Sequence, residues 1–148
     1  MVEFKNLGFV LEEQGRNIVL GITSNPGVQS EATEKVLKLF PSLRNHMAAL
    51  QTTRPPVGLF HHVELNGVDF YFLVVKMRSD NRDYVNYLVR AVNGLSVELR
   101  AREGKWAVAP LVANNDMPIG ATQSIISGIF TDKHPADVTF YLVWLCRL

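Results

Sequence analysis

The sequence has one cysteine, almost no net charge and no long apolar run, and each of these shortages excludes a class of protein. A single cysteine in 148 residues, Cys146, allows no disulfide within the chain, so we expect a reducing compartment. The 15 basic and 14 acidic side chains leave a net charge of +1, which disfavours nucleic acid and anionic membranes as partners. No apolar run approaches the roughly 18 residues of a membrane span, and the first residues lack the layout of a secretory signal. We therefore expect a cytoplasmic protein with no membrane partner.

Patterns that hold metals or cofactors are missing as well. His61 and His62 are adjacent, and neighbours on a strand point to opposite faces, so they cannot easily ligate one ion. No second group of His, Cys or carboxylate side chains stands at metal-ligand spacing. The sequence also has no P-loop, no dinucleotide glycine fingerprint and no nucleophile elbow. It therefore predicts no metal and no cofactor.

The residues that are present predict one α/β domain over residues 1–148. The composition is 47% hydrophobic, which is enough for a core without disulfides. Short apolar runs indicate strands at 17–22, 57–64, 68–75, 106–109 and 137–145. Helical spacing indicates helices at 30–40, 42–50, 83–103 and from about 118. This alternation predicts a three-layer α/β/α sandwich, and an Asn66-Gly67 hairpin between two of the strands makes its β-sheet mixed.

Several residues are expected to begin or interrupt these helices. Ser30 is expected to cap the first helix, Ser42 the second, and Asn81 or Asp80 the third. Gly94 lies inside the third helix and is a point where that helix can break.

Two loops combine features of a binding site for phosphates. Residues 23–30 and 110–118 each follow a predicted strand and lead into a predicted helix. Ligands of α/β sheets gather at the carboxyl ends of the strands. Helix N-termini there present backbone N–H groups and a positive dipole end, which suit phosphate groups.

Three short segments around these loops carry a family resemblance. They are Ile18-Val19-Leu20-Gly21-Ile22 with Asn25 and Gly27, then Phe40-Pro41-Ser42-Leu43, then Val108-Ala109-Pro110-Leu111-Val112-Ala113. In this order they resemble the macro-domain family, over roughly residues 17–142. The resemblance implies a macro-like fold, ADP-ribose or an ADP-ribosylated protein as the partner, and a ligand cleft formed by Asn25, Gly27, Val28, Ser30, Pro110, Val112, Ala113, Asn114 and Asn115.

A finer resemblance is to the compact branch that includes the terminal ADP-ribose protein glycohydrolases. In that branch a hairpin strand ends in a lysine that attacks the ribose, and Phe70-Tyr71-Phe72-Leu73-Val74-Val75-Lys76 is similar to it. The branch also has an aspartate in the second loop, where Asp116 stands. The resemblance implies that Lys76 is the nucleophile and Asp116 the general acid or base of a hydrolase that removes ADP-ribose from modified proteins.

The chain departs from this family at its loops, and the departures support an alternative. Residues 27–32, from the end of the first loop into the helix, contain one glycine, Gly27, where the family's segment is rich in glycine. Glu31, in the same segment, would repel a diphosphate. The alternative is therefore a degenerate macro-like module that binds a protein partner and no nucleotide.

Simple structural roles also account for the residues of the predicted site. Lys76 can be a solvated residue at a strand end, and Asp116 can cap the helix near Pro118. Asn25 can serve as a turn residue before Pro26.

Overall fold

The computed structural model describes residues 1–8, 16–78, 80–113 and 116–143, which form six strands and four helices. The strands are β1 (Val2–Gly8), β2 (Asn17–Thr23), β3 (Phe60–Leu65), β4 (Val68–Lys76), β5 (Lys105–Val108) and β6 (Asp137–Val143). The helices are α1 (Glu31–Leu39), α2 (Pro41–Gln51), α3 (Tyr84–Arg100) and α4 (Ile119–Ile129). None of the described helices is both long and apolar enough to cross a bilayer.

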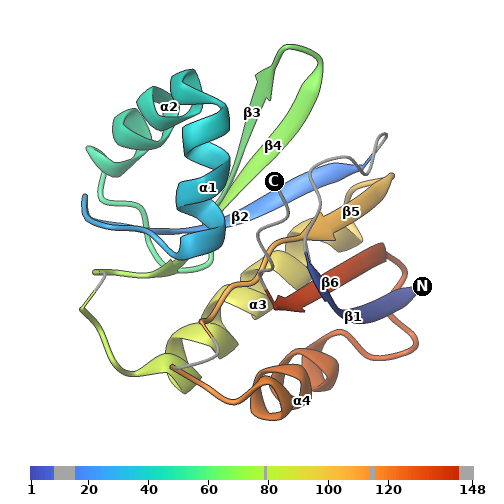
Figure 1. Ribbon diagram of the computed structural model, residues 1–148. Coiled ribbons are helices and arrows are strands. Elements are labelled where there is room, and N and C mark those ends of the chain that lie inside the picture. Colours follow the sequence, from blue (N-terminus) through green and yellow to red (C-terminus); the bar gives the residue numbers. More distant parts are fainter. Residues whose placement is uncertain (9–15, 79, 114–115, 144–148) are drawn as a thin grey trace.

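The strands form one mixed sheet in the order β1-β6-β5-β2-β4-β3. All neighbouring pairs are parallel except β3 with β4, which is the antiparallel hairpin. Helices α1 and α2 cover one face of the sheet and α3 and α4 cover the other (Figure 1). The predicted three-layer sandwich with a mixed sheet is confirmed.

Two apolar cores, one on each face, explain why the middle of each central strand carries apolar side chains on both faces. Ile18, Leu20 and Ile22 of β2 belong to the core under α1 and α2. Val19, between them, belongs to the core under α3 and α4. Because successive side chains of a strand point to opposite faces, a strand between two helical layers has no solvent face for polar residues.

The predicted hairpin forms at Asn66-Gly67. Both residues have positive φ, +52° and +79°, as the tight two-residue turn between antiparallel strands requires.

His62 stacks on Tyr71 with 4.6 Å between ring centroids, and its Nε2 lies 2.6 Å from Oδ1 of Asp69. Within the described residues no group of three or more His, Cys, Asp and Glu side chains is arranged to hold a metal ion.

The helix starts differ in part from those expected. Ser30 caps α1, and its Oγ accepts a hydrogen bond from the backbone N–H of Thr33 at 3.3 Å. The expected cap at Ser42 is wrong, because α2 already begins at Pro41, whose fixed φ suits a first helical position. The expected caps Asn81 and Asp80 are also wrong, because the residue before α3 is Asp83.

Helix α3 runs unbroken through Gly94, and another glycine, Gly58, lies against it there. A Cβ on Gly94 would lie 2.5 Å from the carbonyl oxygen of Gly58 and 2.8 Å from the Gly58 Cα. Gly58, which has φ +96°, precedes β3 and donates its N–H to the Val74 carbonyl at 2.8 Å. The glycine at 94 is therefore a packing requirement, which allows α3 to approach the backbone that leads into the hairpin.

Gly94→Ala should destabilise the protein although alanine favours helix. We expect a loss of about 1–3 kcal/mol in unfolding free energy, because the added methyl overlaps backbone that cannot rotate away. Urea denaturation followed by circular dichroism measures this change.

Gly128→Ala is the matched control for this substitution. Gly128 also lies inside a helix, α4, but a Cβ there meets nothing within 4 Å. This variant should gain about 0.4–1 kcal/mol, because alanine restricts the unfolded chain. Equal effects of the two substitutions would show that the Gly58–Gly94 contact is not required.

Candidate functional site

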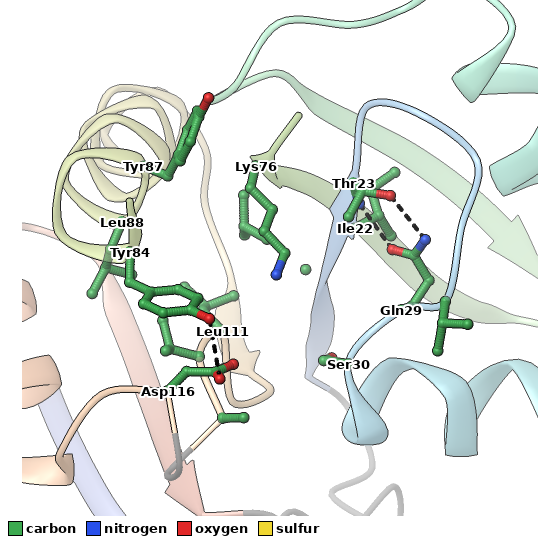
Figure 2. A pocket seen from close by; sticks show the side chains of 15 residues that line it. Ile22, Thr23, Gln29, Ser30, Lys76, Tyr84, Tyr87, Leu88, Leu111 and Asp116 are labelled. Carbon is green, nitrogen blue, oxygen red and sulfur yellow. Dashed lines mark hydrogen bonds between the residues drawn. The ribbon is translucent and has the colours of Figure 1, made fainter. Parts of the chain in front are cut away.

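A cleft opens where β2 and β4 end, at the carboxyl edge of the parallel part of the sheet. It encloses about 210 Å³ and is lined by residues from the ends of both strands, the loop before α1, the first turns of α3 and the loop after β5 (Figure 2). The enclosed volume is below the roughly 300–1,000 Å³ of typical small-molecule pockets. A nucleotide-sized ligand would therefore extend beyond the enclosed part.

An irregularity in the β2–β4 pairing lies at the cleft. Ile22 pairs with Val74, but the next residue, Thr23, pairs with Lys76, so the register shifts by one residue in β4. Thr23 and Lys76 both line the cleft, so the shift falls where the two strands reach it. The Lys76 side chain extends from this end of β4 into the cleft (Figure 2).

The first loop is held closed by the side chain of Gln29, which is only 6% exposed. Its Oε1 accepts the Thr23 N–H at 2.8 Å, and its Nε2 donates to the Thr23 hydroxyl and to the Gly27 carbonyl, both at 2.9 Å (Figure 2). A side-chain amide thus satisfies backbone groups that a buried turn would otherwise leave unpaired.

The end of this loop is bound to α1 through the Glu34 carboxylate. The Gln29 backbone N–H donates to Oε1 of Glu34 at 3.0 Å, and the Arg44 guanidinium lies 2.7 Å from Oε2. Partial burial alone would raise the Glu34 pKa, but the bonds from Arg44 and Gln29 outweigh it and lower that pKa. The Gln29 N–H is therefore committed to Glu34, while Ser30 brings the positive end of α1 to the cleft.

The opposite wall brings together an amine, a phenol and a carboxylate. The Tyr84 hydroxyl donates to Oδ1 of Asp116 at 3.2 Å, and the Lys76 Nζ lies 5.7 Å from the centre of the Tyr84 ring. Figure 2 shows the Lys76 amine extending into the space between Tyr84 on one side and Gln29 and Ser30 on the other. Residues from β4, α3 and the second loop therefore converge on the side of the cleft that faces α1.

The charges around Tyr84 change how readily its hydroxyl ionises. Loss of solvent and the Asp116 carboxylate raise the pKa of the Tyr84 phenol, and the Arg82 guanidinium acts in the opposite direction. The phenol therefore keeps its proton at neutral pH and serves as the donor toward Asp116.

The structure places most, but not all, of the predicted site residues along the cleft. Those lining it are Lys76, Asp116, Val28, Ser30, Val112 and Ala113. Asn25, Gly27 and Pro110 are not among the lining residues, and Asn114 and Asn115 lie outside the described residues. The Asn25 Oδ1 instead accepts a hydrogen bond from Arg54 at 2.7 Å.

Sequence reasoning missed Gln29, Tyr84 and Tyr87 as cleft residues. Tyr84 fits the apolar stripe of α3, because it lies one helical turn before Leu88, and this spacing alone indicates a core residue. The signal that could have found it is its place in the first turn of the helix, next to the carboxyl end of the sheet. Gln29 carried no comparable signal, because its role depends on a backbone turn that only the structure defines.

The sheet order, the two helical layers and the cleft at the strand ends define the macrodomain fold, and solved structures agree. The DarG macrodomain of Thermus aquaticus matches with a TM-score of 0.77 at 14% identity, over 95% of this chain and 97% of that one. The DarG macrodomain of Mycobacterium tuberculosis matches with a TM-score of 0.76 at 16% identity, over 95% and 97%.

A third solved structure is Thermosipho africanus DarTG in complex with ADP-ribose. It matches with a TM-score of 0.72 at 12% identity, over 92% of this chain and 40% of that one. Neither a family model nor a curated protein sequence matches the chain. At these identities the likeness establishes the fold.

Asp116→Asn should lower the pKa of the Tyr84 phenol toward the ordinary value of about 10, because it removes the negative charge that opposes ionisation. Labelling the tyrosines at Cζ with ¹³C allows the titration to be followed by NMR, with Tyr84→Phe assigning the resonance.

Asp83→Asn is the control, since it removes a carboxylate that adjoins Tyr84 in sequence but accepts its hydrogen bond from Asn86. It should shift the Tyr84 titration less than Asp116→Asn. A shift as large from Asp83→Asn would mean that the general charge of this region, and not the Asp116 contact, sets the phenol pKa.

Proposed function

We propose that the cleft binds ADP-ribose. The observation that carries this proposal is the convergence of the N-terminus of α1, Lys76 and Asp116 around one cavity. A diphosphate is attracted by the dipole at the helix N-terminus and by the Lys76 ammonium, and these attractions oppose the repulsion from Glu31 in the first turn of α1. A ribose has hydroxyl groups that can donate hydrogen bonds to a carboxylate such as that of Asp116. Thermosipho africanus DarTG, 40% of whose chain matches this fold, has been solved in complex with ADP-ribose.

We propose further that the cleft hydrolyses ADP-ribose from modified proteins, with Lys76 as nucleophile and Asp116 as acid and base. A Lys76 proton passes to Asp116, and the neutral amine then attacks the anomeric carbon of the distal ribose. The bond from that carbon to the protein's oxygen breaks, and the oxygen takes both electrons and the proton from Asp116. Water then releases ADP-ribose and restores the lysine, so the net reaction consumes one water.

The alternative, a protein-binding module without nucleotide, is favoured by two observations on the first loop. Val28 is 76% exposed at the mouth of the cleft, which suits contact with another protein. Gln29 fills the loop where the family's glycines would let backbone approach a diphosphate. This alternative predicts no binding of any nucleotide.

The purified protein should bind ADP-ribose with micromolar affinity, about −8 kcal/mol, and bind AMP more weakly because AMP lacks the second phosphate and the distal ribose. Isothermal titration calorimetry measures both. Absence of heat with ADP-ribose at millimolar concentration would refute the binding proposal and favour the protein-binding alternative.

A matched pair of charge variants localises the binding to this cleft. Val28→Asp and Val97→Asp add the same charge at residues 76% and 69% exposed, but only Val28 lines the cleft. Val28→Asp should weaken ADP-ribose binding about tenfold through repulsion of the diphosphate, whereas Val97→Asp, on α3, should not change it. Equal effects would place the ligand elsewhere.

Lys76→Arg should abolish hydrolysis while keeping ADP-ribose affinity within about threefold. Arginine keeps the positive charge but stays protonated, so it cannot attack carbon. We expect at least about a hundredfold loss in the rate of ADP-ribose release from a peptide modified on glutamate, followed by chromatography.

Lys38→Ala, which removes an exposed lysine in the last turn of α1, is the control and should keep the full rate. Hydrolysis by Lys76→Arg at the normal rate would exclude the lysine as nucleophile. Binding without any release by the unaltered protein would leave a reader of ADP-ribose in place of an enzyme.

A further inference from the structure

We propose that Tyr84 is a positioning residue that holds both Lys76 and Asp116 in their working arrangement, the ring confining the amine and the hydroxyl orienting the carboxylate. This inference rests on the proposed hydrolytic function and deepens it. It assigns the first residue of α3 a role that neither its apolar spacing nor the family resemblance indicates.

Asp116 needs an external partner because it stands in a loop and is exposed. Its backbone N–H donates to the Ala113 carbonyl at 3.0 Å, which fixes the chain but not the carboxyl group. Among the described residues, the Tyr84 hydroxyl at 3.2 Å is the hydrogen-bond donor that the structure places at this carboxylate. Without it the carboxylate would rotate in solvent, and an acid or base is effective only when it is within hydrogen-bond reach of its proton.

Tyr84 can orient its neighbours because its own place is fixed. It begins a helix of 17 residues, and Leu88, one turn further, is 2% exposed in the core under the sheet. The Tyr84 side chain is itself partly buried against that core. A group held by a rigid element locates a loop carboxylate more precisely than the loop alone can.

The ring of Tyr84 acts on the other partner. The Lys76 Nζ lies 5.7 Å from the ring centre, within the range in which a cation is attracted to an aromatic face. A lysine side chain has many rotamers, and ordering it costs entropy at the moment of reaction unless it is ordered beforehand. The ring therefore contributes to keeping the amine inside the cleft, on the side where Asp116 lies.

A double-mutant cycle tests the link between the hydroxyl and the carboxylate. Tyr84→Phe keeps the ring and removes the hydroxyl, and it should lower kcat for release of ADP-ribose from a glutamate-modified peptide about tenfold. Calorimetric affinity for ADP-ribose should stay within about twofold. In the Asp116→Asn background, measured in single turnovers with excess enzyme, the same change should have no further effect, because the group it orients is already inactive.

Two further variants complete the test: Tyr84→Leu separates the role of the ring from that of the hydroxyl, and Tyr87→Phe is the control. Tyr84→Leu should cost more than Tyr84→Phe, and the additional loss should persist in the Asp116→Asn background because it acts through Lys76. Tyr87→Phe makes the same chemical change one turn along α3, and whatever its effect on kcat, that effect should be the same in both backgrounds.

The outcomes distinguish failure of this inference from failure of the proposed function. If the unaltered protein releases no ADP-ribose, the hydrolytic function fails and the role of Tyr84 fails with it. If the protein is active and Tyr84→Phe is equally active, the function stands and the positioning role is overturned. An undiminished tenfold loss in the Asp116→Asn background also overturns it, since the hydroxyl would then act independently of Asp116.

Discussion

The parallel ladder between β2 and β4 is the constraint on which the cleft depends. It brings the end of β4 beside the first loop, where the Ser24 N–H donates to the Lys76 carbonyl at 2.9 Å. The register of the two strands shifts by one residue between Ile22 and Thr23, and Thr23 pairs with Lys76. Both of these residues line the cleft. The Lys76 amine therefore lies at the cleft because β4 ends beside β2 and the first loop.

The first loop is stabilised by a side chain, Gln29, at a place where the macro-domain family has a loop rich in glycine. Gln29 supplies two donated bonds and one accepted bond to the backbone and side chain of its own loop. The loop gains rigidity and loses the close backbone approach that glycine permits. A diphosphate would then be held mainly by the dipole of α1 and by Lys76, and less by a row of loop amides.

Most of the fold could be predicted because it follows local rules. The double-sided apolar strands, the Asn66-Gly67 turn and the Ser30 cap each depend on a few adjacent residues. Strand β1 was not predicted, since Glu3 and Lys5 interrupt its apolar residues, and it forms by pairing with the distant β6. The requirement for glycine at position 94 likewise depends on Gly58, which is 36 positions away in the sequence. The place of Lys76, Asp116 and Ser30 at the cleft was predicted from the family resemblance, whereas that of Tyr84 was missed, because its place at the cleft is defined only by its neighbours in space.

The electrostatic balance of the cleft favours a ligand with both phosphate and hydroxyl groups. On one side stand the positive end of α1 and the Lys76 amine, and on the other stands the Asp116 carboxylate, held by Tyr84. A purely anionic ligand would meet Asp116 unfavourably, and a neutral sugar would leave the helix dipole unused. A ligand with a diphosphate at one end and a ribose at the other matches both halves. In the proposed function, the ribose and the bond to be broken therefore lie on the side of Tyr84 and Asp116, with the Lys76 amine between that side and the N-terminus of α1.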